Sequence, residues 1–441
     1  MVSSSAAIRR TAGRSEGETR TRDLPDAVRV LLNGAVLVLL WNHLWFKDLS
    51  DRSSLAAAEG GSPVTQALFL AAGVGMALAV WRIGLRHLRP LATPSLALCA
   101  LWLGATSLLS VDPMLSLRRL TLFAIAALLS AGVLVVARSP RQLALTLAGS
   151  AGVILVTCYL AVALVPDLAV HSAFDVNADP DHAGLWRGTF PHKNDASAAM
   201  VILIVVGLYV AAVANRWLGW AVILLAAGFL VASGSKTALL LLPVVLAVTT
   251  LCRLFTGGAM RSLLLVGPVV AFTVVSVGSV LVPSIGDALG GVMRDTTFTG
   301  RTQIWEFAID NILVRPWRGW GIGAFWMTER TMYAGSEELT WVNTAIHSHN
   351  AYLDTALIGG LPFLVLTLAA FVIAPLRDLQ RVAGGRGLDA ETLLFLRLWF
   401  LGLASASFET VLYNGNSATC CMFMMAVFGL RLRTRYAVAA E

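Results

Sequence analysis

Long apolar runs alternate with short polar loops along almost the whole chain. Most runs approach the roughly 20 residues that a helix needs to cross a hydrocarbon core of ~30 Å. We therefore predict an all-α polytopic membrane protein with about twelve transmembrane helices. The predicted spans are residues 28–46, 64–85, 91–111, 120–137, 143–165, 196–214, 218–232, 237–251, 262–282, 351–374, 392–412 and 418–430.

These spans divide the chain into five parts. Residues 1–27 form a tail rich in Ser, Thr, Gly and Arg, which cannot bury a core and is predicted to be disordered. A bundle of about nine helices at 28–283, which contains a polar loop at 166–195, precedes a second, larger polar loop at 284–349. Further membrane helices follow at 350–430, and a short tail at 431–441 ends the sequence.

Composition supports the membrane assignment. Apolar residues make up 57% of the chain and charged residues only 13%, and the mean hydropathy is +0.74. Soluble proteins usually carry about 25% charged residues, so a soluble fold is excluded. The net charge of +7 does not indicate a nucleic-acid partner, because the basic residues lie mostly in short loops. The five cysteines lack metal-type spacing and are interpreted as small buried side chains.

The distribution of arginines predicts the topology, because cytoplasmic loops of membrane proteins are enriched in Lys and Arg. Every second loop is basic, so both termini are expected in the cytoplasm, and the loops 166–195 and 287–349 share the outer face. The basic positions are Arg82, Arg86, Arg89, Arg138, Arg141, Arg216, Arg253, Arg261, Arg377, Arg381, Arg386, Arg431, Arg433 and Arg435.

The larger polar loop contains an expected amphipathic helix. Apolar residues recur at helical spacing from Ile304 to Leu313, and Pro316 ends the pattern. This helix is predicted to lie on the outer membrane surface or against the bundle. Residues 317–326 follow with several glycines and tryptophans, which suit either an interfacial aromatic belt or the stacking of sugars.

Four polar clusters stand at predicted outer ends of helices: residues 187–194, 233–237, 300–305 and 347–350. Cations gathered on the outer face oppose the positive-inside bias, which favours an anionic ligand such as a diphosphate. The alternative for each cation is a side chain that snorkels or pairs with a nearby carboxylate. The candidate diphosphate ligands are Arg187, Lys193, Lys236 and Arg301.

Two glycine-containing segments resemble nucleotide-binding motifs but fail them. The segment before Lys236 lacks the strand and the glycine spacing of a P-loop. The run from Gly319 to Gly323 lacks a third glycine at the required spacing and a surrounding βαβ unit. No nucleotide cofactor is expected.

His349 is the candidate general base. It precedes Asn350, a favourable N-cap, and the positive end of the helix dipole disfavours an imidazolium there. A neutral imidazole can accept a proton, although a structural histidine bonded to a loop carbonyl is the alternative. A metal site on His347 and His349 would need a third ligand, which the sequence spacing does not show, so no metal is expected.

The four clusters resemble motifs of the O-antigen ligase and Wzy-type polymerase superfamily, which are multi-spanning glycosyltransferases of the bacterial inner membrane. One departure is Lys236, where the family usually has arginine, so that the charge is kept and a bidentate grip is lost. The matching positions are Arg187, Gly188, Phe190 and Asn194, then Ser233, Gly234, Ser235 and Lys236, then Gly300, Arg301 and Trp305, and finally His349, Asn350 and Gly360.

The resemblance implies a reaction at the periplasmic face. A glycan carried on undecaprenyl diphosphate is attacked at its anomeric carbon by a sugar hydroxyl, without a metal or other cofactor. His349 would act as the base, with His347 as a second catalytic candidate, and the four cations would hold the diphosphate. The same resemblance gives supporting roles to Asn194, Asn350 and Trp305.

The acceptor is either another lipid-linked repeat, as in a polymerase, or lipid A core, as in a ligase. The sequence His192-Lys193-Asn194 favours an exopolysaccharide polymerase. A chain-length regulator is a candidate partner, beside the lipid bilayer itself.

Two functions of other classes stay open. A lipid-linked glycan flippase should carry ionisable groups deep in its spans, and Arg397 and Glu409 are the main candidates. A non-catalytic chain-length or assembly protein would tolerate loss of every histidine.

Overall fold

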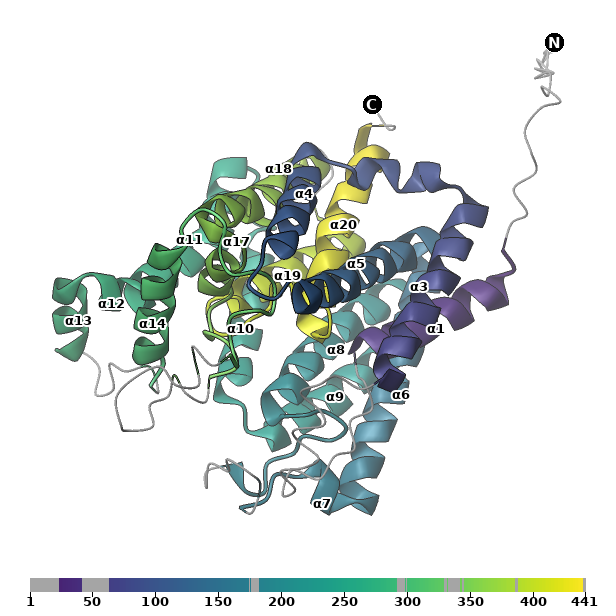
Figure 1. Cartoon of the computed structure of the whole chain (residues 1–441). Helices are drawn as coiled ribbons and strands as arrows, with labels where there is room; N and C mark the ends of the chain where they lie inside the picture. Colours follow the sequence, from purple (N-terminus) through teal and green to yellow (C-terminus); the bar gives the residue numbers. More distant parts are fainter. Residues whose placement is uncertain are drawn as a thin grey trace, which may run out of the picture.

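The computed structural model describes residues 24–41, 63–173, 175, 182–291, 298, 300–328, 331, 342, 345–384 and 388–438. Over these residues the chain forms helices and no β-strand, with one isolated bridge between Val170 and Trp186 (Figure 1). The predicted all-α class is confirmed. Most of the predicted tail at 1–27, and residues 42–46 of the first predicted span, lie outside the described residues.

The helices carry the labels of Figure 1. The first half contains α1 (Asp26–Trp41), α3 (Pro63–Ile83), α4 (Pro94–Leu108), α5 (Pro113–Val136), α6 (Pro140–Leu164), α7 (Pro166–Ala169), α8 (Lys193–Val213) and α9 (Arg216–Ser233). The second half contains α10 (Lys236–Leu251), α11 (Gly258–Ser276), α12 (Gly278–Leu281), α13 (Pro283–Gly290), α14 (Arg301–Val314), α17 (Ala351–Leu368), α18 (Ala374–Ala383), α19 (Ala390–Ser405) and α20 (Ala418–Val438). A π-helical turn, Ala369–Ile373, joins α17 to α18.

Each predicted span coincides with a helix, but the number of twelve spans is not confirmed. Seven described helices are long and apolar enough to cross a membrane, or eight if the bent pair Leu85–Leu91 and Pro94–Leu108 is one span. The seven are Pro63–Ile83, Pro113–Val136, Pro140–Leu164, Lys193–Val213, Arg216–Ser233, Gly258–Leu281 and Ala351–Ala383. The chain is a multi-pass membrane protein.

One predicted span ends earlier than expected. The apolar run at 392–412 continues past Ser405, yet α19 ends there and residues 406–417 form a loop before α20. This loop holds Glu409 and Thr410, whose side chains would be costly within a span. The correction moves Glu409 out of the bundle and into a connection.

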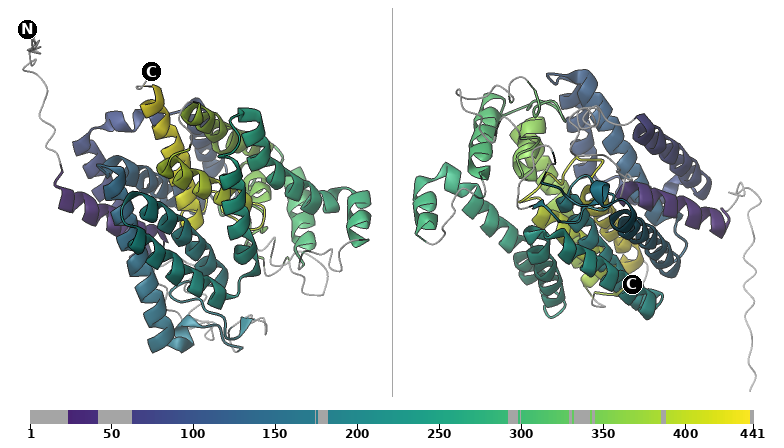
Figure 2. Two further views of the ribbon diagram at one scale, coloured as in Figure 1. Left: turned by 180° about the vertical axis from the view of Figure 1, so that it is seen from behind. Right: turned by 90° about the horizontal axis from the view of Figure 1, so that it is seen from below.

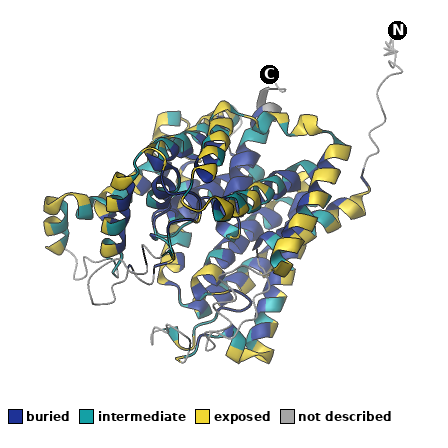
Figure 3. Ribbon diagram, in the orientation of Figure 1, coloured by how far each residue is buried: buried dark blue, intermediate teal, exposed yellow. Residues whose placement is uncertain are grey.

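The centre of the bundle is α8. In its most apolar 18-residue window 72% of the residues are buried, against 17% in Gly258–Leu281, so α8 lies inside and α11 lies at the periphery (Figures 2 and 3). The outer helices expose large apolar side chains such as Trp81, Leu101, Leu224 and Leu240. Exposure of such residues around a bundle is expected where lipid replaces water.

The predicted amphipathic helix is confirmed as α14, and it packs against the bundle. Its buried residues include Ala308 and Ile312, which pack with residues of α17 and of the segment that follows α14. Within that segment Trp320 is 5% exposed and its indole donates to the carbonyl of Asn311, while Trp317 is 73% exposed. Trp320 is therefore part of the core, and the aromatic-belt and sugar-stacking interpretations stay predictions for the exposed Trp317.

Gly360 bends α17 and shapes the segment above it. Its φ of 76° and ψ of 179° lie in a region that is almost confined to glycine, and a Cβ there would meet the backbone of Trp317 at 2.5 Å. Pro362, two residues on, lacks the N–H that would bond the carbonyl of Ile358. The loop after α14 forms hydrogen bonds with the backbone groups that this break leaves unpaired. The loop donates from Trp320 N to Leu357 O and from Gly321 N to Ile358 O, and its Pro316 O accepts from Leu361 N. Trp102 of α4 adds a bond from its Nε1 to Gly359 O.

The break at Gly360 yields a stability prediction. Gly360→Ala should lower the free energy of unfolding by about 2 kcal/mol or more, since alanine is strained at this φ and ψ and meets backbone atoms that cannot move aside. The matched control is Gly149→Ala in α6, where an added Cβ meets nothing within 4 Å. Thermal unfolding in detergent should show a lower Tm for Gly360→Ala and an equal or higher Tm for Gly149→Ala. Equal melting of both variants would refute this role of Gly360.

Candidate active site

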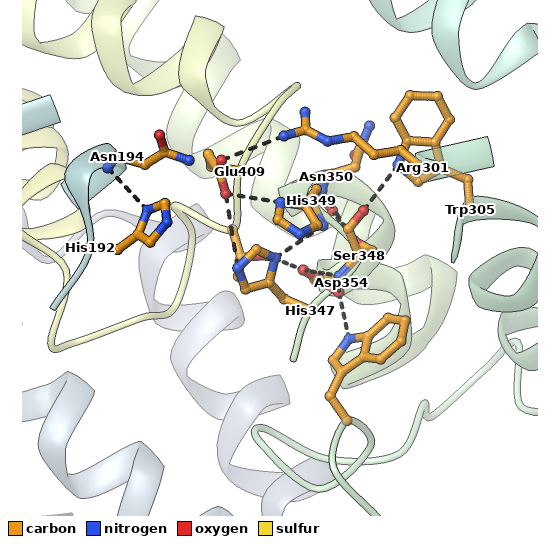
Figure 4. A network of polar contacts seen from close by, with 12 residues as sticks. His192, Asn194, Arg301, Trp305, His347, Ser348, His349, Asn350, Asp354 and Glu409 are labelled. Carbon is orange, nitrogen blue, oxygen red and sulfur yellow. Dashed lines mark hydrogen bonds and ion pairs between the residues drawn. The ribbon is translucent and has the colours of Figure 1, made fainter. Parts of the chain in front are cut away.

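Glu409 collects three of the predicted site residues around one carboxylate (Figure 4). Its Oε2 lies 3.2 Å from Nδ1 of His349 and 3.9 Å from Nε2 of His347, and its Oε1 lies 3.7 Å from a terminal nitrogen of Arg301. These groups come from the start of α14, the loop before α17 and the loop after α19. The structure thus joins the third and fourth polar clusters directly.

The loop that carries the histidines is held from several sides. The side chain of Asn350 accepts hydrogen bonds from the N–H groups of Tyr352 and Leu353, which confirms it as the N-cap of α17. Ser348 is fully buried, and its carbonyl accepts from the indole of Trp305 at 3.0 Å. This bond holds Trp305 against the histidine loop.

A buried carboxylate, Asp354, also holds the histidine loop by hydrogen bonds. Asp354 in the first turn of α17 is 4% exposed and accepts from the N–H of Ser348 at 3.2 Å and from the indole of Trp326 at 2.8 Å. The hydroxyl of Thr410, next to Glu409, donates to the same carboxylate. Asp354 therefore ties the histidine loop to the Glu409 loop (Figure 4).

The hydrogen bonds separate the roles of the two histidines. His347 Nδ1 accepts the N–H of His349 at 3.1 Å, so the proton of neutral His347 is on Nε2, facing Glu409. His349 has φ of 53°, a left-handed value that turns its N–H toward His347. With Glu409 ionised, His349 donates through Nδ1 and keeps the lone pair of Nε2, which bonds to no described residue.

Burial and charge set the ionisation of this cluster. Burial alone raises the pKa of Glu409, but the hydrogen bond from Nδ1 of His349 and the positive charge of Arg301 outweigh it and hold that pKa below its ordinary value. Burial and the neighbouring His349 lower the pKa of His347 to about 4. At neutral pH the site therefore contains an ionised Glu409 beside a neutral His347.

The first polar cluster lies across Glu409 from the histidine loop (Figure 4). Burial, with the charges of His171, His182 and Lys193, lowers the pKa of His192 to about 3, so its imidazole is neutral. The Nδ1 of His192 accepts the N–H of Asn194 at the start of α8. Asn194 in turn accepts from the hydroxyl of Ser235 at 3.4 Å, which joins the first and second clusters.

Lys236 begins α10 and stands at one end of an apolar cavity of about 330 Å³. The cavity lies between α10, α11 and α19, and at the Lys236 end it also touches Ser407 and Phe408, which directly precede Glu409. A cation at the mouth of an apolar cavity suits an amphiphile with an anionic head. Other lining residues are Leu240, Val244, Val269, Phe272, Phe400 and Ala404.

Two predicted cations lie in less open positions. Arg187 is 1% exposed and donates from a terminal nitrogen to the carbonyl of Phe190 within its own loop. Lys193 is 9% exposed at the first turn of α8. In this structure Arg187 braces its loop, and the open cations around the cavity and Glu409 are Lys236 and Arg301.

By distance alone His347, His349 and Glu409 could hold a metal ion, since one ligand atom of each lies within 4.8 Å of the others. Glu409 is thus the third ligand that sequence spacing did not reveal. The hydrogen bonds disfavour this arrangement, because the Nδ1 lone pair of His347 is already used and its Nε2 carries the proton. The positive charge of Arg301 beside Glu409 also repels a cation.

The sequence interpretation missed the anchoring role of Asp354 and the place of Glu409 in the site. The position of Asp354, in the first turn of a helix that begins with His349-Asn350, was an available signal. Glu409 was noted as an ionisable residue within a span, and only the early end of α19 brings it to His349.

Comparisons with known proteins cover three of the four motifs. Residues 220–368 match the family model described as O-antigen ligase, a region that includes Lys236, Arg301, His347 and His349. The chain is also similar to the exopolysaccharide production protein ExoQ of Rhizobium meliloti (strain 1021), with 29% identity over 197 residues. That match covers 42% of this chain and 42% of ExoQ, so it spans less than half of either protein.

Both comparisons confirm the resemblance predicted from the motifs. The matched region begins in α9, contains the Arg301 helix and the histidine loop, and ends with α17. In this region the chain is similar to the O-antigen ligase and Wzy-type polymerase superfamily.

Proposed function

We propose that this protein transfers a glycan from undecaprenyl diphosphate to a sugar hydroxyl, and that it does so at the periplasmic face of a bacterial inner membrane. The observation that carries the proposal is the convergence of His349, His347 and Arg301 on Glu409, next to an apolar cavity with Lys236 at its mouth. A base, an anion-binding group and a lipid-sized apolar space are the three parts that such a transfer needs.

The chemical step is a displacement at the anomeric carbon. The acceptor hydroxyl oxygen forms a bond to that carbon while the bond from carbon to the diphosphate oxygen breaks. The electron pair of the broken bond leaves on the diphosphate, and the hydroxyl proton passes to Nε2 of His349. His349 is the assigned base because Nε2 is free of described partners, whereas both nitrogens of His347 are engaged.

Glu409 positions His349 and stabilises the imidazolium that forms. Its carboxylate accepts from Nδ1 and therefore keeps the lone pair on Nε2, and its negative charge favours the protonated product of the step. His347 supports this geometry by accepting the N–H of His349. Glu409 is thus a positioning residue in the proposal.

The leaving diphosphate gains negative charge as the bond breaks. The partly exposed Arg301 and the exposed Lys236 are the cations that can meet it, and Lys193 lies at the start of α8. The first isoprene units of the donor fit the apolar cavity beneath Lys236. Arg187, which is buried, acts by holding the loop that carries His192.

Polymerisation of exopolysaccharide repeats is the favoured version of the reaction. The similarity to a protein named for exopolysaccharide production supports it, as does the His192-Lys193-Asn194 sequence. The alternative acceptor is lipid A core, as in an O-antigen ligase. A flippase is less supported, because Glu409, one of its two candidate ionisable residues, lies in a loop and only Arg397 lies within a helix. The predicted chain-length regulator remains a candidate partner.

The assignment of residues predicts the effect of three substitutions in cells. His349→Ala should reduce polymer formation ~10²- to 10⁴-fold through loss of the base, and Arg301→Ala ~10²-fold or more through loss of charge stabilisation. Glu409→Gln should reduce it at least ~10-fold, since the amide keeps a hydrogen bond but loses the charge. Polymer length and yield are measured by gel electrophoresis at matched membrane protein levels.

Each variant has a control of the same chemistry outside the cluster. His87→Ala, Arg318→Ala and Glu306→Gln alter exposed residues and should leave the polymer unchanged. Accumulation of short lipid-linked repeats on the outer membrane face in the His349→Ala strain supports the transferase. Accumulation on the inner face would support a flippase, and full-length polymer from His349→Ala would refute the base.

The ionisation of Glu409 predicts a pH profile. Its pKa lies below the ordinary value of 4.5, so the carboxylate is ionised throughout pH 5 to 8. It loses its negative charge only on further acidification. The ratio of initial rates of the purified wild type and Glu409→Gln should therefore be constant from pH 5 to 8 and approach one below about pH 4.5. A defect that appears only above pH 6 would contradict an ionised Glu409.

A further inference from the structure

One end of the bundle, opposite the histidine loop, carries arginines that the proposed reaction does not use. This far end consists of the carboxyl end of α10, the amino ends of α11 and α19, and the carboxyl end of α20. Positive-inside bias accounts for arginines in its loops. It does not account for Arg397, which lies seven residues inside α19, about 10 Å along the helix axis.

The guanidinium of Arg397 has no protein partner among the described residues. Its Nε is buried without a hydrogen bond, and no ion pair joins the side chain to any carboxylate in the described chain. The charged group that acts on it is Arg253, a like charge in the turn after α10. Charged side chains within membrane helices normally pair with each other or with a ligand.

The carboxylates of the far end are already neutralised by other arginines. Asp378 pairs with Arg381 and Arg431, and Arg433 pairs with both Asp389 and Glu391. Asp26, farther along the same end, pairs with Arg138. The described carboxylates there thus leave no counter-ion for Arg253 or Arg397.

A third arginine adds to the positive field. Arg261, in the first turn of α11, is 4% exposed and donates through Nε to the carbonyl of Cys252, the residue before Arg253. This bond fixes the turn between α10 and α11 with Arg253 beside it. The far end therefore presents a rigid basic turn next to a half-buried, unpartnered guanidinium.

We propose that Arg397 and Arg253 bind a phosphate group, supplied by the headgroup of an anionic phospholipid or by a soluble phosphate. Arginine binds phosphate oxygens side-on through Nε and one terminal nitrogen, and this pairing satisfies the buried Nε of Arg397. Basic pockets between helices at a membrane surface are typical headgroup sites. The site stands independently of the transferase proposal.

The test uses the full chain, delipidated in detergent, with dioleoylphosphatidylglycerol added back and bound lipid counted by native mass spectrometry. Wild type and Arg86→Gln, a control at an exposed arginine of the same end, should bind this lipid equally. Arg397→Gln and Arg253→Gln should bind it at least ~10-fold more weakly. Arg397→Lys should keep part of the affinity, because the charge remains and the fork is lost.

A parallel arm measures thermal stabilisation by inorganic phosphate. If phosphate raises the Tm of the wild type but not that of Arg397→Gln, and the two proteins bind lipid equally, the site is assigned to a soluble phosphate. If Arg397→Gln does not fold, the other two variants decide the test. Arg253→Gln changes an exposed residue, and Arg397→Lys keeps the positive charge, so both are expected to fold. Equal binding of both probes by the wild type and these variants overturns the proposal.

Discussion

The arrangement of this site depends on one carboxylate. Glu409 meets Arg301 from the start of α14 and His347 and His349 from the loop before α17, and without it these three side chains would have no common partner. The hydrogen bond from His349 and the charge of Arg301 keep the carboxylate ionised despite its burial. The ionised carboxylate in turn determines which nitrogen of His349 holds the proton.

The scaffold fixes these groups with polar bonds placed where helices end or bend. Asp354 joins the histidine loop to the Glu409 loop, and Asn350 caps the helix beneath both. Farther along α17, the break at Gly360 frees carbonyls that the segment after α14 then satisfies. The helix α14, which begins with Arg301, packs on α17 and leads into this segment, so the bend in α17 constrains the helix that carries that guanidinium. A motif glycine eleven residues after His349 thus acts on the site through packing.

Much of this could be predicted from the sequence. Apolar periodicity located a helix for every predicted span, and the N-cap signal at Asn350 was confirmed. The number of true spans could not be predicted, because α10, α19 and other apolar runs are helical but short, and length decides whether a helix crosses lipid. Glu409 was hidden for a related reason, since the apolar run around it continues past the point where α19 ends.

Side-chain roles were harder to predict than helix positions. Arg187 was interpreted as a diphosphate ligand from its charge and motif, yet its burial follows from tertiary contacts that no local pattern records. The choice between His347 and His349 likewise depends on a hydrogen bond that only the structure shows, from the backbone N–H of His349 to Nδ1 of His347. Sequence gives the identity of a titratable group, while the direction of its lone pair depends on the fold.

The most direct measurement is reconstitution of the purified protein in liposomes with a repeat unit linked to undecaprenyl diphosphate, without a nucleotide sugar. The account predicts that glycans longer than one repeat appear together with an equivalent amount of released undecaprenyl diphosphate, and that His349→Ala yields neither. Translocation of the repeat without any lengthening, or lengthening that is unaffected by His349→Ala, would contradict it.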